Sequence, residues 1–110
     1  MIEDTVSKIE AKIQAADAIN DERKRELLQL LGKLKSEISR LSRTHGEQAE
    51  SIAGFTELST HEAIRNERNP ELLKLSLKGL TSSVDEFEKS HPQLVQSVNA
   101  ISTMLSNLGI

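Results

Sequence analysis

Three histidines, His45, His61 and His91, are the side chains best able to exchange protons near neutral pH. Glu57 and His61 are four residues apart, so they share one face if this segment is helical. Glu88 and His91 have the Glu-x-x-His spacing of di-iron bundles, but such a site needs a second copy of the motif and further carboxylates. Because a metal site needs three or four converging ligands, we expect no metal and no cofactor. The histidines are better interpreted as exposed or capping residues.

Motifs for nucleophilic catalysis and phosphate binding are missing as well. No serine lies in a Gly-x-Ser-x-Gly turn, and Ser90 beside His91 is better explained as a helix cap. Gly46 and Gly54 fall in a helical pattern and lack the Lys-Ser/Thr of a P-loop. With no cysteine, the chain has neither disulfides nor thiolate chemistry. The sequence therefore predicts no enzyme, no catalytic residue and no small-molecule ligand.

Basic residues concentrate between positions 23 and 43. They are Arg23, Lys24, Arg25, Lys33, Lys35, Arg40 and Arg43, and they alternate with Asp21, Glu22, Glu26 and Glu37. This mixture favours a solvated helix face over contact with nucleic acid, and the formal net charge is −3. We keep a nucleic-acid or ribosome accessory factor, using this basic face, as the alternative function.

The composition indicates that helices position all of these residues. The apolar content is mostly leucine, isoleucine and valine, Phe55 and Phe87 are the only aromatic residues, and there are two prolines and five glycines. A length of 110 residues suits one domain, so we assign 1–110 to a single all-α domain. The first residues lack an export signal and no stretch approaches the ~20 apolar residues that span a bilayer, so we expect a cytoplasmic protein.

Helix boundaries come from capping residues and from apolar spacing. Asn20 with Asp21, and Asn69 with Pro70, have the chemistry of helix N-termini. We predict about four helices in a hairpin-based, coiled-coil-like bundle, with residues 1–44 forming an N-terminal hairpin region and 45–110 the C-terminal helices. The predicted ranges are about 2–18, 21–66, 70–89 with Leu73, Leu77, Leu80, Val84 and Phe87 on its seam, and 92–108.

The continuity of the second helix is open between residues 44 and 47. Thr44 and Glu47 have the spacing of a capping box, which predicts a new helix. Apolar and small positions nevertheless resume through Ala49 and Ile52 after one extra four-residue step, which a continuous helix absorbs as a stutter. We favour one long helix, bent near Gly46.

A leucine seam on the second helix predicts self-association. Its members are Leu27, Leu31, Leu34, Ile38 and Leu41. A rod from 21 to 66 would be ~69 Å long, and the shorter helices would leave it with only two or three helices in cross-section. Because apolar area left in water is unfavourable at ~25 cal/mol per Å², we expect a homodimer to cover this seam.

The segment from Ser90 to Ile110 contains no aspartate, glutamate, lysine or arginine. Its apolar residues recur at steps of three and four and form one helical stripe, made of Leu94, Val98, Ile101, Leu105 and Leu108. We interpret this stripe as a face that either packs inside the fold or binds a partner.

Three segments carry a resemblance to a known family. They are 45–53 (His-Gly-Glu-Gln-Ala-Glu-Ser-Ile-Ala), 69–73 (Asn-Pro-Glu-Leu-Leu) and 87–92 (Phe-Glu-Lys-Ser-His-Pro), the last leading into a terminal Leu108-Gly109-Ile110. Together they resemble a bacterial family of short helical proteins known only as a domain of unknown function. The resemblance covers the C-terminal sixty-odd residues, implies a bacterial cytoplasmic protein and carries over no catalytic residue.

These observations favour a non-enzymatic, self-associating helical module that binds another protein. An exposed groove or the uncharged C-terminal helix would supply the contact surface for that protein.

Overall fold

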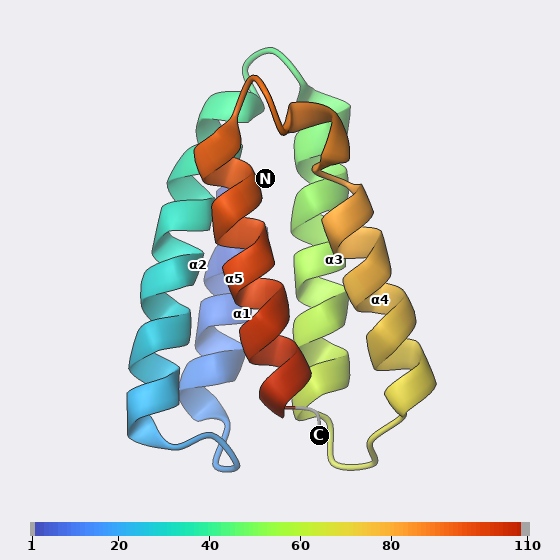
Figure 1. Cartoon of the computed structure of the whole chain (residues 1–110). Helices are drawn as coiled ribbons and strands as arrows, with labels where there is room; N and C mark the ends of the chain where they lie inside the picture. The colour runs from blue at the N-terminus through green and yellow to red at the C-terminus, as the bar shows by residue number, and fades with distance from the viewer. Residues whose placement is uncertain (1, 109–110) are drawn as a thin grey trace.

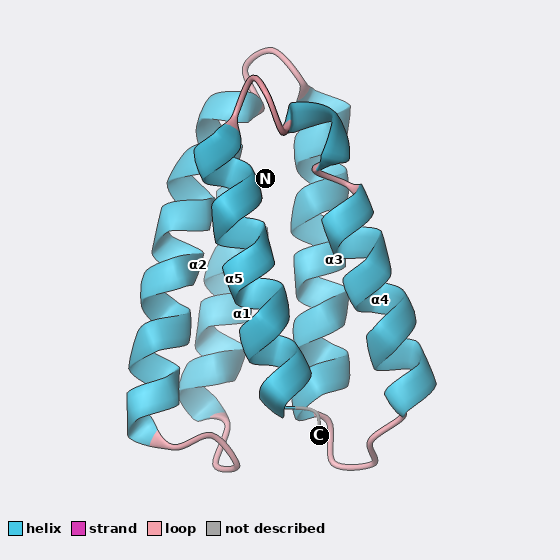
Figure 2. Cartoon of the chain, viewed as in Figure 1, coloured by secondary structure: helices cyan, strands magenta, loops and turns pink. Residues whose placement is uncertain are grey.

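The computed structural model describes residues 2–108, which form five α-helices and one short 3₁₀ turn and contain no strand (Figures 1 and 2). The elements are α1 (Ile2–Ala15), α2 (Asp21–Leu41), α3 (Gly46–Ile64), α4 (Pro70–Ser82), η1 (Asp85–Phe87) and α5 (Pro92–Leu108). The predicted all-α class is confirmed, with five helices rather than about four. None of the helices in this range is long and apolar enough to cross a bilayer.

The helices run alternately down and up along a molecule of 37 × 24 × 21 Å (Figure 1). Accordingly α1, α3 and α5 point one way and α2 and α4 the other. α5 packs between α2 and α4, while α1 packs on α2 and α3. α3 touches each of the other four α-helices, so it is the central element of the bundle.

The prediction of one continuous helix over 21–66 is wrong, because the chain reverses between Ser42 and His45. Ser42 donates its side-chain hydroxyl to the Ser39 carbonyl at 2.7 Å, and the backbone N–H groups of Arg43 and Thr44 bond three residues back, which tightens the last turn of α2. α3 then begins at Gly46. The reversal buries both Leu41 and Ala49 in one core, which a straight rod would leave on an uncovered surface.

Two other predicted helices end earlier than expected. α4 ends at Ser82 instead of 89, where Thr81 and Ser83 hydroxyls bond to carbonyls three or four residues back and the chain turns through η1 to bury Phe87. α1 ends at Ala15 instead of 18, since a turn then buries Ile19. The predicted range 92–108 agrees with α5, and Gly109 and Ile110 lie outside the described residues.

Asparagine caps start α2 and α4, as the sequence predicts. The Asn20 side-chain oxygen accepts a hydrogen bond from the backbone N–H of Arg23 at 2.8 Å, and that of Asn69 accepts from Leu72 at 3.2 Å. Each bond satisfies a donor that has no partner within its own helix.

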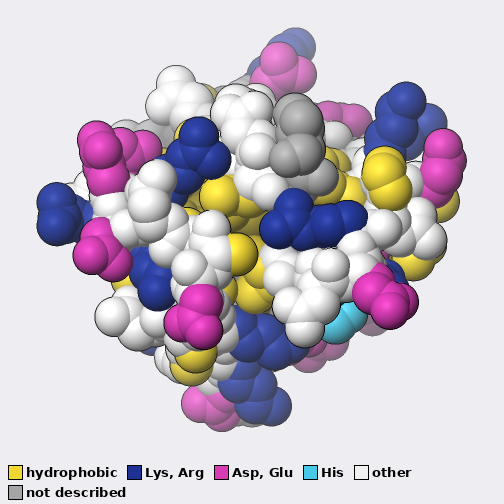
Figure 3. Space-filling model, turned by 90° about the horizontal axis from the view of Figure 1, so that it is seen from below, with side chains coloured by type: hydrophobic (Ala, Val, Ile, Leu, Met, Phe, Trp, Pro, Cys, Tyr) yellow, Lys and Arg dark blue, Asp and Glu magenta, His cyan; other side chains and the backbone are white. Residues whose placement is uncertain are grey.

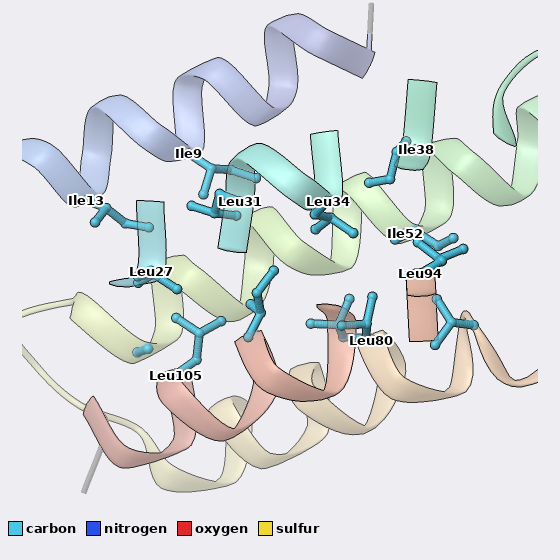
Figure 4. Close-up of a cluster of buried hydrophobic side chains, with 14 of the residues drawn as sticks. Ile9, Ile13, Leu27, Leu31, Leu34, Ile38, Ile52, Leu80, Leu94 and Leu105 are labelled. Atoms are coloured by element: carbon cyan, nitrogen blue, oxygen red, sulfur yellow. The ribbon is translucent and has the colours of Figure 1, made fainter. Parts of the chain in front are cut away.

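The large apolar side chains meet in one core. Figure 4 shows side chains of α2 pointing toward those of α1, α3, α4 and α5. Among the largest fully buried residues are Ile9, Ile13, Leu27, Leu31, Leu34, Ile38, Ile52, Leu80, Leu94, Ile101 and Leu105. The leucine seam of α2 is therefore part of the core of a single chain.

The buried face of α3 is made mostly of small side chains. Its buried residues include Ala49, Ala53, Thr56, Ser59, Thr60 and Ala63, with Ile52 as the one large aliphatic member. The Thr56 and Thr60 hydroxyls donate to carbonyls one turn earlier in α3, at 2.7 and 2.8 Å. The Ser59 hydroxyl has no hydrogen-bond partner within the described part of the chain. Small side chains let four neighbouring helices approach α3 closely.

The Asn20 cap gives a direct test of the α1–α2 connection. Asn20→Ala removes the hydrogen bond to the Arg23 N–H and should lower the free energy of unfolding by about 1 kcal/mol in urea denaturation. Asn99→Ala is the control, because Asn99 is exposed in the middle of α5 and alanine is the better helix former. Equal losses in the two variants would contradict the capping role.

Candidate functional site

The structure brings two of the three histidines together at one end of the bundle. His45 precedes α3 and His91 precedes α5, and both rings pack edge-on against Phe87, with centroid distances of 5.3 and 5.5 Å. The two imidazole centroids are 6.4 Å apart. Sequence reasoning missed this pair, because the residues are far apart in the chain.

Each imidazole in this pair also contacts the hydroxyl of the preceding residue. Thr44 Oγ1 lies 2.8 Å from His45 Nδ1, and Ser90 Oγ lies 2.9 Å from His91 Nδ1. If the hydroxyl donates, the imidazole proton is on Nε2. No three His, Asp or Glu residues within 2–108 are placed to hold a metal ion together. The geometry therefore indicates two loops packed around Phe87.

The predicted self-association seam is buried inside the single chain. Leu27, Leu31, Leu34 and Ile38 have no exposed surface, and Leu41 has almost none. These side chains pack on the chain's own helices, so they are not available to a second chain in the folded state. The length argument that assigned them to a dimer no longer applies, because the long rod is absent.

The C-terminal stripe is buried in the same way. Leu94, Val98, Ile101 and Leu105 are fully buried, and Leu108 is half-buried against the core. Arg68, in the α3–α4 loop, donates its Nη1 to the Leu108 carbonyl at 2.6 Å and so caps the end of α5. Of the two roles predicted for this stripe, the structure places its residues in the fold.

A core substitution tests whether the seam stabilises the single chain or forms an interface between two chains. Leu31→Ala should lower the free energy of unfolding by about 2–5 kcal/mol, because it leaves a cavity in a fully buried site. The molar mass in light scattering should remain that of the wild-type protein. Gln29→Ala, at an exposed position of the same helix, is the control and should reduce stability far less. A change of mass with little loss of stability in Leu31→Ala would instead identify the seam as an interface.

The basic residues of α2 do not share one face. Lys24 donates to the Gln14 carbonyl and Lys35 to the Ser7 hydroxyl, both at 3.0 Å, so these two lysines are on the α1 side. Lys33 and Arg40 instead line a groove of about 560 Å³ between α2 and α5. Arg40 Nη2 is also paired with Glu37 at 3.0 Å.

A second groove, between α1 and α3, is lined by carboxylates and small residues. It has a volume of about 490 Å³, and Glu3, Glu50 and Glu57 lie along it. The pKa of Glu3 is lowered from 4.5, first by a hydrogen bond from its own backbone and then by the Ser39 hydroxyl, which donates to Glu3 Oε1 at 3.0 Å. This bond links the first turn of α1 to α2.

The Ser39 contact can be measured by carboxyl titration. Ser39→Ala should move the pKa of Glu3 part of the way back toward 4.5, because the backbone hydrogen bond remains. A lowered folded-state pKa stabilises the fold above 4.5, so the stability difference between variant and wild type should disappear as the pH falls through the folded pKa. NMR titration with Ser36→Ala as control tests this, and an unchanged Glu3 titration would contradict the contact.

Large apolar side chains are exposed along the boundary between α3 and α4. Phe55 and Leu58 of α3 are 36% and 45% exposed, and Leu72 and Leu75 of α4 are 42% and 61% exposed. We call these four residues the apolar patch. Viewed from the end that carries the α1–α2 and α3–α4 loops, hydrophobic side chains also reach the surface on the α4 side, among charges of both signs (Figure 3).

The patch spans two helices that are in close contact. A Cβ added at Gly79 of α4 would lie under 3 Å from three atoms of the Phe55 ring, so this ring covers the glycine. The sequence contained a signal for the patch, since Phe55 and Leu58 fall outside the buried positions of α3, and Leu72 and Leu75 fall beside the buried Leu73 and Leu80.

Comparison with known proteins gives a family and no further relative. No curated protein and no solved structure was found to match the chain. The family model described as Domain of unknown function (DUF4404) matches residues 27–110, from Leu27 in α2 through α5. The match extends further toward the N-terminus than the three resembling segments do, and it confirms the resemblance that they carry. Because the model spans well over half of the sequence, the chain belongs to this family, whose function is unknown.

Proposed function

We propose that this protein is a non-enzymatic, self-associating helical module that docks through the apolar patch. The observation that supports the proposal is the exposure of Phe55, Leu58, Leu72 and Leu75 side by side on α3 and α4. Contiguous exposed apolar side chains with a polar rim are typical of protein-binding surfaces. The proposal moves the predicted homodimer contact from the α2 seam to this patch.

The position of the patch supports docking over a role in the fold. None of the four side chains belongs to the core cluster, and only Phe55 packs between α3 and α4, where its ring covers Gly79. Leaving leucine and phenylalanine in water is unfavourable at ~25 cal/mol per Å². A second protein surface would remove this area from water at no loss to the core.

The arrangement of the histidines supports a non-enzymatic role. His45 and His91 each use Nδ1 for an adjacent hydroxyl and pack on the same phenylalanine, as parts of a loop contact. The alternative function, a nucleic-acid or ribosome accessory factor, has less support, because Lys24 and Lys35 are directed to α1 whereas Lys33 and Arg40 are on the α5 side. We place the module in the bacterial cytoplasm, as the family resemblance implies, with no small-molecule ligand.

Light scattering coupled to size exclusion tests the proposal. The wild-type protein at tens of micromolar should have a molar mass twice the 12.2 kDa of one chain. Leu75→Glu should give a folded monomer, because it puts a charge into the middle of the contact at a position that is 61% exposed in the single chain. Circular dichroism should show unchanged helix content.

Ala11→Glu is the matched control for Leu75→Glu. Ala11 is exposed on α1, away from the patch, and receives the same charge. This variant should retain the dimer. A wild-type monomer at this concentration, or equal dissociation in both variants, would contradict self-association through the patch.

A further inference from the structure

We infer that two copies pair about a two-fold axis parallel to α3 and α4, so that α3 of each copy lies on α4 of the other. The inference rests on the proposed function and specifies how the second copy fits the apolar patch. It follows from the distribution of charge on either side of the patch.

α3 is acidic along the edge that faces away from α4. Between Gly46 and Ile64 the helix contains four glutamates and no lysine or arginine. Glu50 and Glu57 line the groove against α1, so they border the patch on the side opposite α4. We call Glu50 and Glu57 the acidic edge.

α4 is cationic along its own outer edge. Lys74 and Lys78 are exposed and lie one helical turn apart. Gly79 faces α3, where Phe55 covers it, and at ~100° per residue Lys78 is about 100° and Lys74 about 140° around the helix from Gly79. We call Lys74 and Lys78 the lysine edge. Neither lysine nor Glu57 has a side-chain hydrogen bond or ion pair within residues 2–108.

Symmetric dimers through this patch fall between two limiting arrangements of the two-fold axis. With the two-fold axis across the helices, α3 faces α3 and α4 faces α4, which puts Glu57 near the second copy's Glu57 and Lys74 near the second copy's Lys74. With the axis along the helices, the acidic edge of each copy faces the lysine edge of the other. Opposite charges across an interface select its orientation, so the second arrangement is favoured.

Near the α3–α4 loop, the charges of the two helices are reversed. Glu71 is exposed in the first turn of α4, and Arg65 follows the last residue of α3. An axis along the helices brings Glu71 toward Arg65 of the second copy, so opposite charges face each other at this end as well. Arg65 also bonds to Glu62 of its own chain at 2.9 Å, which holds the guanidinium at this end.

The size of the face suits a small, reversible contact. α4 has 13 residues beside the 19 of α3, so the part that is two helices wide is about 20 Å long and about 20 Å across. The projected area of about 400 Å² per chain is in the range of weak, transient interfaces, which bury less than ~600 Å² per chain.

Charge reversal on one or both helices tests the pairing. Lys74→Glu with Lys78→Glu should raise the dimer Kd about tenfold at low salt, and Glu50→Lys with Glu57→Lys should do the same, with smaller effects at high salt. The chain that carries all four substitutions should dimerise nearly as well as wild type, because the edges are then exchanged and again complementary. Sedimentation equilibrium measures all three, and circular dichroism verifies that each variant is folded.

Lys8→Glu with Lys12→Glu is the matched control, since these exposed lysines of α1 are also four residues apart and lie away from the patch. It should leave the Kd unchanged. A wild-type dimer whose Kd is unaffected by reversal of the lysine edge alone would overturn the inferred orientation and leave the proposed function standing. A wild-type monomer would overturn both.

Discussion

The close packing of four helices around α3 is the constraint on which the bundle depends. Alanine, serine and threonine make up most of its buried face, and α1, α2, α4 and α5 all contact it. Larger side chains there would separate the helices and open the leucine core formed by α2 with α1 and α5. The same arrangement leaves the opposite side of α3 at the surface beside α4, where the apolar patch lies. The inner face of α3 thus contributes to the core, and its outer face contributes to the patch.

The starts of α2 and α4 were predictable from the sequence, whereas the break after Leu41 was one of two open alternatives and the early end of α4 was missed. Asn20 and Asn69 accept hydrogen bonds from residues three positions further on, and Pro70 has a backbone angle suited to the first position of a helix, so the effect of all three is local. The break after Leu41 has a different cause, because its hydroxyl bonds are weak local signals and the burial of Leu41 with Ala49 depends on the whole bundle. The end of α4 likewise depends on where Phe87 can be buried.

The difference between local signals and contacts that depend on the whole bundle also explains what could be predicted of the candidate site. The apolar spacing correctly identified the residues of α2 that avoid water. Their assignment to a second chain depended on the predicted length of the second helix, and that length was wrong. The pairing of His45 with His91 is a tertiary contact between loops, and no local pattern encodes it. The leucines beside the main stripe of α4 were visible in the sequence, but which of them remain exposed depends on how many helices cover that side.

The buried hydroxyls of the bundle have a consequence for sequence change. Thr56, Thr60 and Ser76 all donate to carbonyls of their own helices, so these bonds do not join one helix to another. Replacing such a residue by alanine or another small side chain leaves no hydrogen-bond acceptor of a neighbouring helix without its donor. Substitutions at these positions that preserve side-chain volume should therefore leave the arrangement of the helices unchanged, because no hydrogen bond between helices depends on them.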